Sequence, residues 1–230
     1  MPDWESLPDN IRTDEVRPYY DALVKKEKQL CAKRMIDVGV SVFLLLLLLP
    51  VLIGIGIAVA TTSKGGVFFC QERVTTGGRL FKIIKFRTMV KNAEELGAKV
   101  TSDEDVRVTE IGAFLRKYRL DELPQLINII MGDMSLVGTR PEVMEYVDKY
   151  TPEMMATLLM PAGVTSEASI KYKDEAKKLS GVTGEDADSV YVDEILPEKM
   201  KYNLDYVKNY SVFKDIKLCL LTVTEVFKDE

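Results

Sequence analysis

The chain has 230 residues, of which 47% are hydrophobic and 29% are charged, and its formal net charge is −5. This length suits one folded domain with small appendages, and the negative charge argues against a general nucleic-acid binder. The chain contains no histidine, which excludes a Ser-His-Asp or Cys-His catalytic centre and any His-ligated metal site. Three widely spaced cysteines without a Cys-x-x-Cys pair favour a reducing, cytosolic setting.

A long apolar segment follows a polar, partly helical lead-in over residues 1–32. Residues 38–60 carry no charge, and a run of roughly 20 apolar residues is the usual mark of a membrane-spanning helix. Pro50 lies inside this run, where it removes a backbone hydrogen bond and bends or breaks the helix. Two interpretations stay open: a single-pass anchor with a kink, and a re-entrant helix-break-helix that enters one leaflet and returns.

Basic residues flank the apolar segment on both sides, and positive charge tends to stay in the cytoplasm. They are Lys25, Lys26, Lys28, Lys33 and Arg34 before it, and Lys64, Arg73, Arg79 and Lys82 after it. This pattern favours a cytoplasmic location for both ends of the segment. At its entry, Asp37 is spaced to pair with Arg34 across one helical turn.

Beyond the apolar segment, the pattern predicts a β-hairpin. After a turn over residues 61–66, residues 67–74 are typical of a strand. The paired glycines within residues 75–79 indicate a tight turn, and residues 80–87 form the expected return strand.

Several helices are predicted downstream of the hairpin. The first covers residues 91–96 and is followed by a polar loop through Asp105. Thr109 is a suitable N-cap for the next helix, in which Ile111, Phe114 and Leu115 share one face.

A further helix is predicted to begin around Asp121, because Pro124 is well tolerated in a first turn. Its expected buried face consists of Leu123, Leu126, Ile127 and Ile130. Residues 152–159 are predicted to be helical, and residues 181–188 a flexible acidic loop. Tyrosines and lysines flank apolar residues over 197–227, a composition that fits either a helix lying among lipid headgroups or ordinary core packing.

Asp121 and Glu122 form the best candidate pair for chemistry. Carboxylates in a first helical turn lie beside unpaired backbone N–H groups, which stabilise negative charge and bound phosphate. Such a pair can hold Mg²⁺, and a carboxylate can act as a nucleophile at phosphorus. The alternative is that both residues are solvated charges at a helix N-terminus.

Cations in the surrounding sequence favour the chemical interpretation. Arg116 precedes the pair, Arg140 follows it, and Lys85 and Arg87 end the predicted return strand. Guanidinium groups bind phosphate bidentately and lysine supplies a point charge, so the grouping predicts a diphosphate site.

Five ordered motifs resemble a known family, the bacterial sugar transferases, which are monotopic polyprenyl-phosphate phosphoglycosyl transferases. The motifs are KRMID at 33–37, FFCQER at 68–73, FKIIKFRTM at 81–89, LRKYRLDELPQL at 115–126 and GDMSLVGTRP at 132–141. The resemblance is firm over residues 33–163 and looser after them. It implies a small catalytic-core member of the family.

The resemblance implies a mechanism and roles for named residues. Asp121 would attack the β-phosphate of a UDP-sugar, releasing UMP, and the phosphosugar would then pass to a polyprenyl phosphate, typically undecaprenyl phosphate. Glu122 and Asp121 would hold Mg²⁺. Arg116 and Arg140 would bind phosphates, and Lys85 and Arg87 would line the substrate site.

The implied architecture is an α/β fold that is mostly helical. It comprises the lead-in 1–32, a re-entrant membrane helix-break-helix over 33–62, and a cytosolic catalytic domain over 63–230 with a short β-hairpin and interfacial C-terminal helices. The implied location is the cytoplasmic face of the bacterial inner membrane, with both termini cytoplasmic and Cys31 and Cys70 on that side.

The sequence departs from the family pattern at three places. Leu49 replaces the serine that commonly precedes the helix-breaking proline, so the break would rest on Ser41 or on protein contacts. Thr139 stands where proline is usual, and residues 160–167 only approximate the family's Pro-Gly segment. Two other functions stay open: a membrane-anchored non-catalytic scaffold or binding protein, and a glycosyl transferase that releases UDP.

Overall fold

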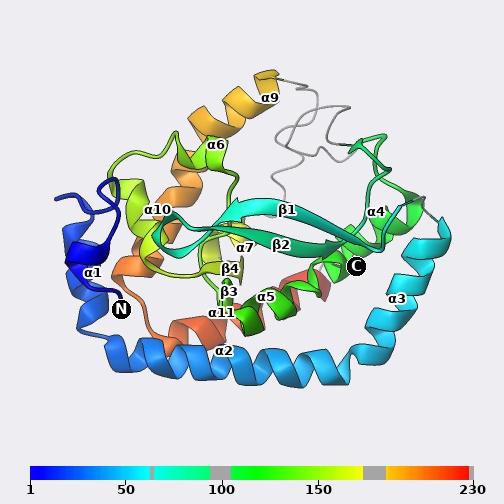
Figure 1. Cartoon of the computed structure of the whole chain (residues 1–230), viewed down its shortest axis with the longest axis horizontal. Coiled ribbons are helices and arrows are strands. Elements are labelled where there is room, and N and C mark those ends of the chain that lie inside the picture. Colours follow the sequence, from blue (N-terminus) through cyan, green and yellow to red (C-terminus); the bar gives the residue numbers. More distant parts are fainter. Residues whose placement is uncertain (63–64, 94–104, 173–184, 228–230) are drawn as a thin grey trace.

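A computed structural model describes residues 1–62, 65–93, 105–172 and 185–227. The chain is mostly helical, and its described strands form one antiparallel and one parallel two-stranded sheet. A long bent helical arm runs along one side of the molecule, and the remaining elements pack above it (Figure 1). The expected α/β class with a short hairpin is confirmed.

The arm consists of helix α2 (Glu27–Leu47) and helix α3 (Leu49–Thr62). The two are bent by 65° at Leu48, next to Pro50. Within the described residues no single helix is both long and apolar enough to cross a membrane, whereas α2 and α3 together meet that test. Ser41 does not support the break through a hydrogen bond, because its buried Oγ has no partner among the described residues.

Polar contacts fasten α2 to the rest of the protein. Asp37 does not pair with Arg34 as the helical spacing predicted. It accepts a hydrogen bond from the Ser135 hydroxyl (2.6 Å) and lies 3.5 Å from the ammonium of Lys33. Arg34 instead donates to the backbone carbonyl of Ile129 at 2.6 Å, at the end of another helix. Lys33 and Arg34 precede Asp37 by four and three residues, and both spacings allow a contact across one helical turn, so tertiary partners decide which cation Asp37 uses.

The N-terminal residues contribute to the largest apolar core rather than lying apart from it. They include the short 3-10 helix η1 (Trp4–Ser6) and helix α1 (Arg17–Val24). Ile11, Val16 and Leu23 are fully buried among residues from the C-terminal half.

The predicted hairpin is present. Strand β1 (Phe68–Val74) pairs in antiparallel register with β2 (Leu80–Phe86), and the turn between them contains η2 (Thr76–Gly78). Gly77 and Gly78 both have positive φ, a conformation that glycine adopts without a steric cost.

Helix α4 (Glu110–Lys117) begins as predicted, since the Thr109 side chain accepts a hydrogen bond from the Gly112 amide. Leu115 faces the interior, but Phe114 on the predicted apolar face is half exposed. Of the helix predicted over 91–96, residues 91–93 form a turn, and the rest lies outside the described residues.

The helix predicted around Asp121 has two parts, the 3-10 turn η4 (Leu120–Glu122) and helix α5 (Gln125–Met131). Its buried face differs from the prediction. Leu126 is buried, but Leu123, Ile127 and Ile130 are only partly buried. The other buried residues of α5 are Gln125, Asn128 and Ile129.

A second sheet, which the sequence pattern did not reveal, follows α5. Strand β3 (Met134–Val137) pairs in parallel with β4 (Ala162–Thr165). Just past the end of β3, Gly138 approaches Gly163 closely: a Cβ on Gly163 would lie 2.1 Å from the Gly138 nitrogen. Only glycine fits at this contact.

Three short helices flank β4 in the sequence: α6 (Met144–Val147) and the 3-10 helix η5 (Glu153–Leu159) precede it, and α7 (Glu167–Lys171) follows it. The helix predicted over 152–159 is therefore confirmed.

The C-terminal part is helical from α9 (Glu185–Val190) onward. A π-helical turn, η6 (Tyr191–Ile195), leads into α10 (Leu196–Lys208), and α11 (Val212–Phe227) ends the described chain. The prediction of a loop through residue 188 is wrong for residues 185–188, and residues 181–184 lie outside the described chain.

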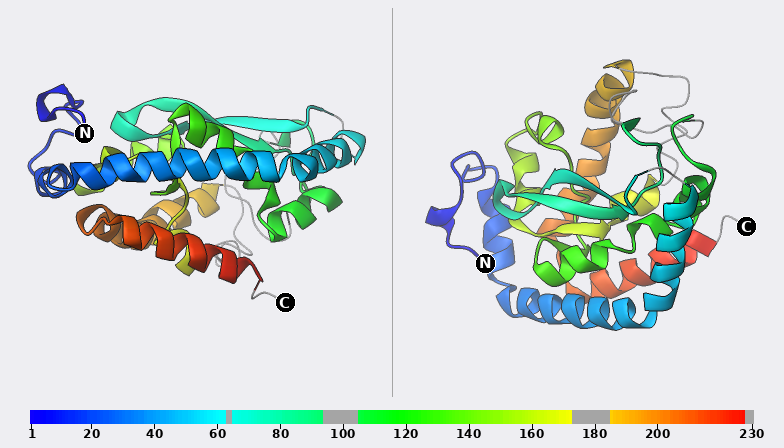
Figure 2. Two further views of the ribbon diagram at one scale, coloured as in Figure 1. Left: turned by 90° about the horizontal axis from the view of Figure 1, so that it is seen from below. Right: turned by 45° about the vertical axis from the view of Figure 1, so that its right-hand side comes forward.

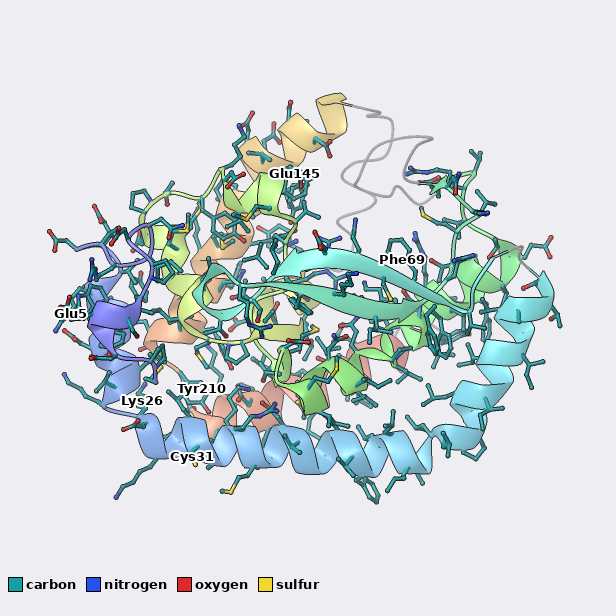
Figure 3. All side chains as sticks on the ribbon, in the orientation of Figure 1. Glu5, Lys26, Cys31, Phe69, Glu145 and Tyr210 are labelled. Atoms are coloured by element: carbon teal, nitrogen blue, oxygen red, sulfur yellow. The ribbon has the colours of Figure 1, made fainter. Side chains whose placement is uncertain are left out.

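The two last helices differ in packing. Helix α10 lies within the core, where Met200, Tyr206 and Val207 are buried. Helix α11 contacts α2 and runs alongside it (Figure 2). Near the start of α2, the Lys26 ammonium donates to the Tyr210 carbonyl at 2.8 Å, which ties α2 to the turn between α10 and α11 (Figure 3).

Asn128 connects α5 to the hairpin. It is fully buried, its Oδ1 accepts from the Ile84 amide at 3.0 Å, and its Nδ2 donates to the Lys82 carbonyl at 2.8 Å. We predict that Asn128→Ala lowers the free energy of unfolding by about 2 kcal/mol, because two buried backbone groups lose their partners. Thermal unfolding in detergent measures this. Met131→Ala, at an exposed position of the same helix, is the matched control, and equal stabilities of the two variants would contradict the prediction.

Candidate active site

Asp121 and Glu122 lie side by side in the turn η4, and each is only 8% exposed. The turn begins immediately after Arg119, which has a φ of 54° in the left-handed region. This conformation is unfavourable for a residue with a side chain. The left-handed conformation of Arg119 changes the chain direction after α4. The turn η4 that follows places the carboxylates of Asp121 and Glu122 in the interior.

Glu122 is held by two cations from different elements. Its Oε1 accepts a hydrogen bond from Lys85 Nζ at 2.9 Å and another from Arg140 Nη2 at 2.9 Å. Burial alone would raise the pKa of Glu122, but Arg140 and Lys85 outweigh it and hold this pKa below its ordinary value. Glu122 is therefore ionised across the physiological pH range.

Asp121 is in a different state. No hydrogen bond or ion pair of its carboxylate is found within the described part of the chain. Burial and the neighbouring charge of Glu122 raise its pKa to about 6, and Lys85, Arg116 and Arg140 act in the opposite direction. Like charges at close range separate the pKa values of two carboxyls in this way. Asp121 thus has free oxygens in a positively charged surrounding.

Arg116 projects from the last turn of α4 and is held by Thr88, whose hydroxyl accepts from Arg116 Nε at 2.8 Å. Burial lowers the pKa of Arg116, whereas Asp121 acts to raise it. The guanidinium stays charged, since arginine does not lose its proton in proteins. Its remaining N–H groups can donate to an anion bound beside Asp121.

A third arginine, Arg73 near the end of β1, supports the segment that carries Arg140. Its Nη1 donates to the Pro141 carbonyl at 3.3 Å and lies 3.7 Å from a carboxylate oxygen of Glu142. Its other side is bound by the Gln71 side chain, which accepts from Arg73 Nη2 at 2.6 Å. Burial and the nearby charge of Arg140 act to lower the pKa of Arg73, with Glu142 opposing them.

The site offers oxygen ligands for a hard cation, although no cluster of three or more acidic or cysteine side chains is found in the described residues. Asp121 has both carboxylate oxygens free, and Glu122 uses Oε1 for its two cations. A carboxylate pair of this kind can bind Mg²⁺ together with phosphate and water oxygens.

Comparison with known proteins identifies a family for this sequence. The profile of the bacterial sugar transferase family matches residues 28–229. The chain belongs to the bacterial sugar transferase family. The match includes α2, both carboxylates of η4 and the helices up to α11.

Three relatives illustrate the similarity of this bacterial sugar transferase to other members. It is 36% identical over 167 residues to a UDP-N-acetylgalactosamine-undecaprenyl-phosphate N-acetylgalactosaminephosphotransferase of Aeromonas hydrophila, covering 71% of this chain and 36% of that protein. It is 34% identical to a UDP-glucose:undecaprenyl-phosphate glucose-1-phosphate transferase of Escherichia coli, covering 92% of this chain and 43% of that protein. It is 35% identical to the uncharacterised sugar transferase EpsL of Bacillus subtilis, covering 86% and 88%. The chain therefore spans less than half the length of the first two relatives.

The structure brings together most of the candidate residues of this bacterial sugar transferase. Lys85 and Arg140 contact Glu122, and Arg116 interacts electrostatically with Asp121. Arg87 lies elsewhere: its guanidinium packs against Gly65, where a Cβ would lie 1.4 Å from Nη1. This places Arg87 at the turn after α3 rather than among the described contacts of the two carboxylates.

Sequence reasoning did not select Thr88, Arg73 or Glu142 as site residues. Thr88 lies in the motif at 81–89 and Arg73 in the motif at 68–73, and membership of these motifs was the feature that could have indicated a place at the site. No sequence motif marks Glu142, which follows Pro141. Its environment is set by tertiary structure, because its side chain is buried and accepts a hydrogen bond from the Tyr191 hydroxyl at 2.5 Å.

The raised pKa of Asp121 leads to a stability prediction. The raised pKa means that the folded state favours the protonated form of Asp121. The contribution of this protonated carboxyl to the free energy of unfolding is therefore complete below the ordinary pKa of 3.8 and is lost as the pH rises through about 6. Asn is neutral at every pH, so Asp121→Asn is expected to be more stable than the wild type at pH 7, by on the order of 2 kcal/mol. The difference should shrink as the pH falls below 6, which thermal unfolding at several pH values measures.

The matched control for this prediction is Asp148→Asn, which removes a carboxylate at an exposed position after α6. That variant should follow the wild type at each pH. If Asp121→Asn also follows the wild type at pH 7, the carboxylate is not held in an unfavourable environment.

Proposed function

We propose that this chain transfers a phosphosugar from a UDP-sugar to undecaprenyl phosphate through a covalent intermediate on Asp121, releasing UMP. The observation that carries the proposal is a buried Asp121 with free oxygens beside a Glu122 whose charge is held by Lys85 and Arg140. The names of the Aeromonas and Escherichia relatives, which are undecaprenyl-phosphate sugar-phosphate transferases, support it.

The first step is attack of an Asp121 carboxylate oxygen on the β-phosphorus of the donor. A new bond forms between this oxygen and phosphorus, and the bond from phosphorus to the oxygen bridging the two phosphates breaks. The bridging oxygen leaves with the electron pair as part of UMP. The sugar-1-phosphate group is then attached to Asp121 as an acyl phosphate.

The second step returns the enzyme to its starting state. A phosphate oxygen of the lipid acceptor attacks the same phosphorus atom, and the acyl-phosphate bond to Asp121 breaks. The product is a sugar linked to the lipid through a diphosphate, and the Asp121 carboxylate is free again. Burial supports both steps because it excludes water that would otherwise hydrolyse the intermediate.

The cations are placed to neutralise the diphosphate. Arg116 and Arg140 have guanidinium N–H groups that suit phosphate oxygens, and Lys85 adds a third positive charge. Charge that develops on the leaving UMP is stabilised by such preorganised donors in a site with little water. Glu122 holds two of these cations in position.

We further propose Mg²⁺ as the cofactor, held by Asp121 and by Glu122 through the oxygen that its cations leave free. When bound, Mg²⁺ would neutralise diphosphate charge and orient the β-phosphorus. The repulsion between the two carboxylates, which raises the pKa of Asp121, supports a bound cation here.

The proposed location is the cytoplasmic face of the bacterial inner membrane, with α2 and α3 as a re-entrant pair. The 65° bend beside Pro50 and the apolar character of the pair support this topology. The exposed apolar side chains of α11, which lies beside α2, support an interfacial position for that helix.

The direct test is product analysis with purified protein, undecaprenyl phosphate, Mg²⁺ and a panel of UDP-sugars. UMP release is expected with the proper donor, and Asp121→Asn should lower it by roughly a thousandfold or more, as expected for loss of a nucleophile. Mass spectrometry after acid quenching should find a sugar-phosphate adduct on the peptide that contains Asp121. Chelation of Mg²⁺ should abolish release.

Asp148→Asn is the control, since it removes an exposed carboxylate and should retain full activity. Release of UDP in place of UMP would favour the glycosyl transferase alternative. Absence of any nucleotide release, with every donor, would favour a scaffold or binding protein. Equal activity of Asp121→Asn and the wild type would remove Asp121 from the mechanism.

The topology is tested by thiol labelling in intact spheroplasts. Cys31 on α2 and Cys70 on β1 are both exposed, and Cys219 can be replaced by Ser so that only they report. An impermeant maleimide is expected to label neither thiol until detergent is added. Labelling of Cys31 alone before permeabilisation would indicate a single crossing and contradict the re-entrant pair.

A further inference from the structure

An apolar groove lies between α2 and α11, away from the two carboxylates of the active site. Its volume is about 210 Å³. Ile36 and Val40 form one wall, Ile216 and Leu220 the other, and Leu136 of β3 contributes to the floor. Cys219 also faces it, and burial raises the pKa of this thiol to about 11, so it adds no charge at neutral pH.

The charged residues that line the groove form ion pairs with one another. Lys33 Nζ lies 2.7 Å from Asp215 Oδ2 and 3.5 Å from Asp37 Oδ2. The other oxygen of Asp215 accepts from the Tyr206 hydroxyl at 2.7 Å. The space that remains is therefore lined by hydrocarbon. Such a surface suits apolar molecules better than water, because a water molecule against it lacks hydrogen-bond partners on the protein side.

Both rims of the groove belong to apolar stripes that face outward. On α2 the stripe follows helical spacing and consists of Ile36, Val40, Phe43 and Leu47. On α11 it consists of Phe213, Ile216, Leu220 and Val223. All eight side chains are exposed, and α11 lies beside α2 near its start and diverges from it toward the C-terminal end (Figure 2). Exposed apolar surface that continues over two neighbouring helices marks an interaction site.

The α2 stripe identifies the partner, because it continues into the bent apolar pair α2–α3 that meets the test for a membrane segment. A groove whose rim belongs to that segment opens into hydrocarbon when the segment is in a bilayer. We propose that the groove binds an acyl chain of a membrane phospholipid, which fills the space between α2 and α11. The inference rests on the membrane location in the proposed function.

The test uses vesicles of phosphatidylethanolamine and phosphatidylglycerol in which some acyl chains carry a diazirine. The full-length protein is reconstituted, irradiated and mapped by peptide mass spectrometry. Adducts are expected on Leu136 at the groove floor as well as on the exposed rim residues. Adducts confined to outward-facing residues such as Phe43 and Phe213, with none on Leu136, would overturn the proposal.

Filling the groove provides the decisive comparison. Cys219→Phe should abolish the Leu136 adduct, whereas Val223→Phe, which adds the same ring farther along α11, should leave it unchanged. Val40→Phe fills the groove from the opposite wall and serves if the first variant does not fold, as judged by circular dichroism. A Leu136 adduct that persists in the filled variants would contradict binding inside the groove.

Two further outcomes separate this inference from the proposed function. If unlabelled undecaprenyl phosphate removes the Leu136 adduct while excess phospholipid does not, the groove holds the acceptor chain and the phospholipid assignment is wrong. If the protein does not float with vesicles, the membrane location itself fails, and the inference fails with it. UMP release that continues without any Leu136 adduct would overturn the inference alone.

Discussion

The attachment of Glu122 to Lys85 and Arg140 determines how the rest of the site is built. Lys85 comes from the end of β2, Glu122 from η4, and Arg140 from the segment after β3. One buried carboxylate therefore joins three parts of the chain that lie far apart in sequence. Removing Lys85 or Arg140 would leave the buried Glu122 carboxylate with one cation fewer. The resulting loss of stability would exceed the net contribution of that ion pair to folding, because the buried charge would be poorly compensated. The same arrangement leaves Asp121 without a strong partner and so available to a substrate.

A second buried polar cluster joins the helical arm, α2 and α3, to the rest of the protein. Lys33, Asp37 and Asp215 join α2 to α11, and Ser135 connects them to β3. Because β3 leads within three residues to Arg140, the position of the arm and the position of the site cations are set by the same short strand. At the proposed membrane location, a bilayer that orients α2 would thereby also orient Asp121 and Glu122 relative to the lipid surface.

Features that depend on local pattern could be predicted from the sequence, and features that depend on tertiary contact could not. The hairpin and the Thr109 cap follow from alternation, paired glycines and a capping residue. Strand β3 has only four residues, Met134–Val137, which is too short for its pattern to distinguish strand from helix. Its pairing depends on Gly163 meeting Gly138.

The candidate site shows the same division. Lys85, Arg116 and Arg140 were selected from their motifs and from the family resemblance, and they do gather at the carboxylates. Arg87 shares its motif with Lys85, and in a continued strand the two side chains would share one face because they are two residues apart. Arg87 instead lies beyond the last paired residue of β2 and packs against Gly65. Arg73 donates a hydrogen bond to the backbone carbonyl of Pro141, and a contact with a distant backbone group cannot be predicted from a sequence pattern.

The close approach of Gly138 and Gly163 has a consequence for how this sequence could diversify. A methyl group at either position would push the two backbones apart, and the displaced segment is the one that presents Arg140 two residues later. Sequence variation around the candidate site is therefore more accessible through side chains that border Asp121 and Glu122 than through this crossing of the backbone. As long as both glycines are kept, residues elsewhere can vary without displacing the backbone that presents Arg140.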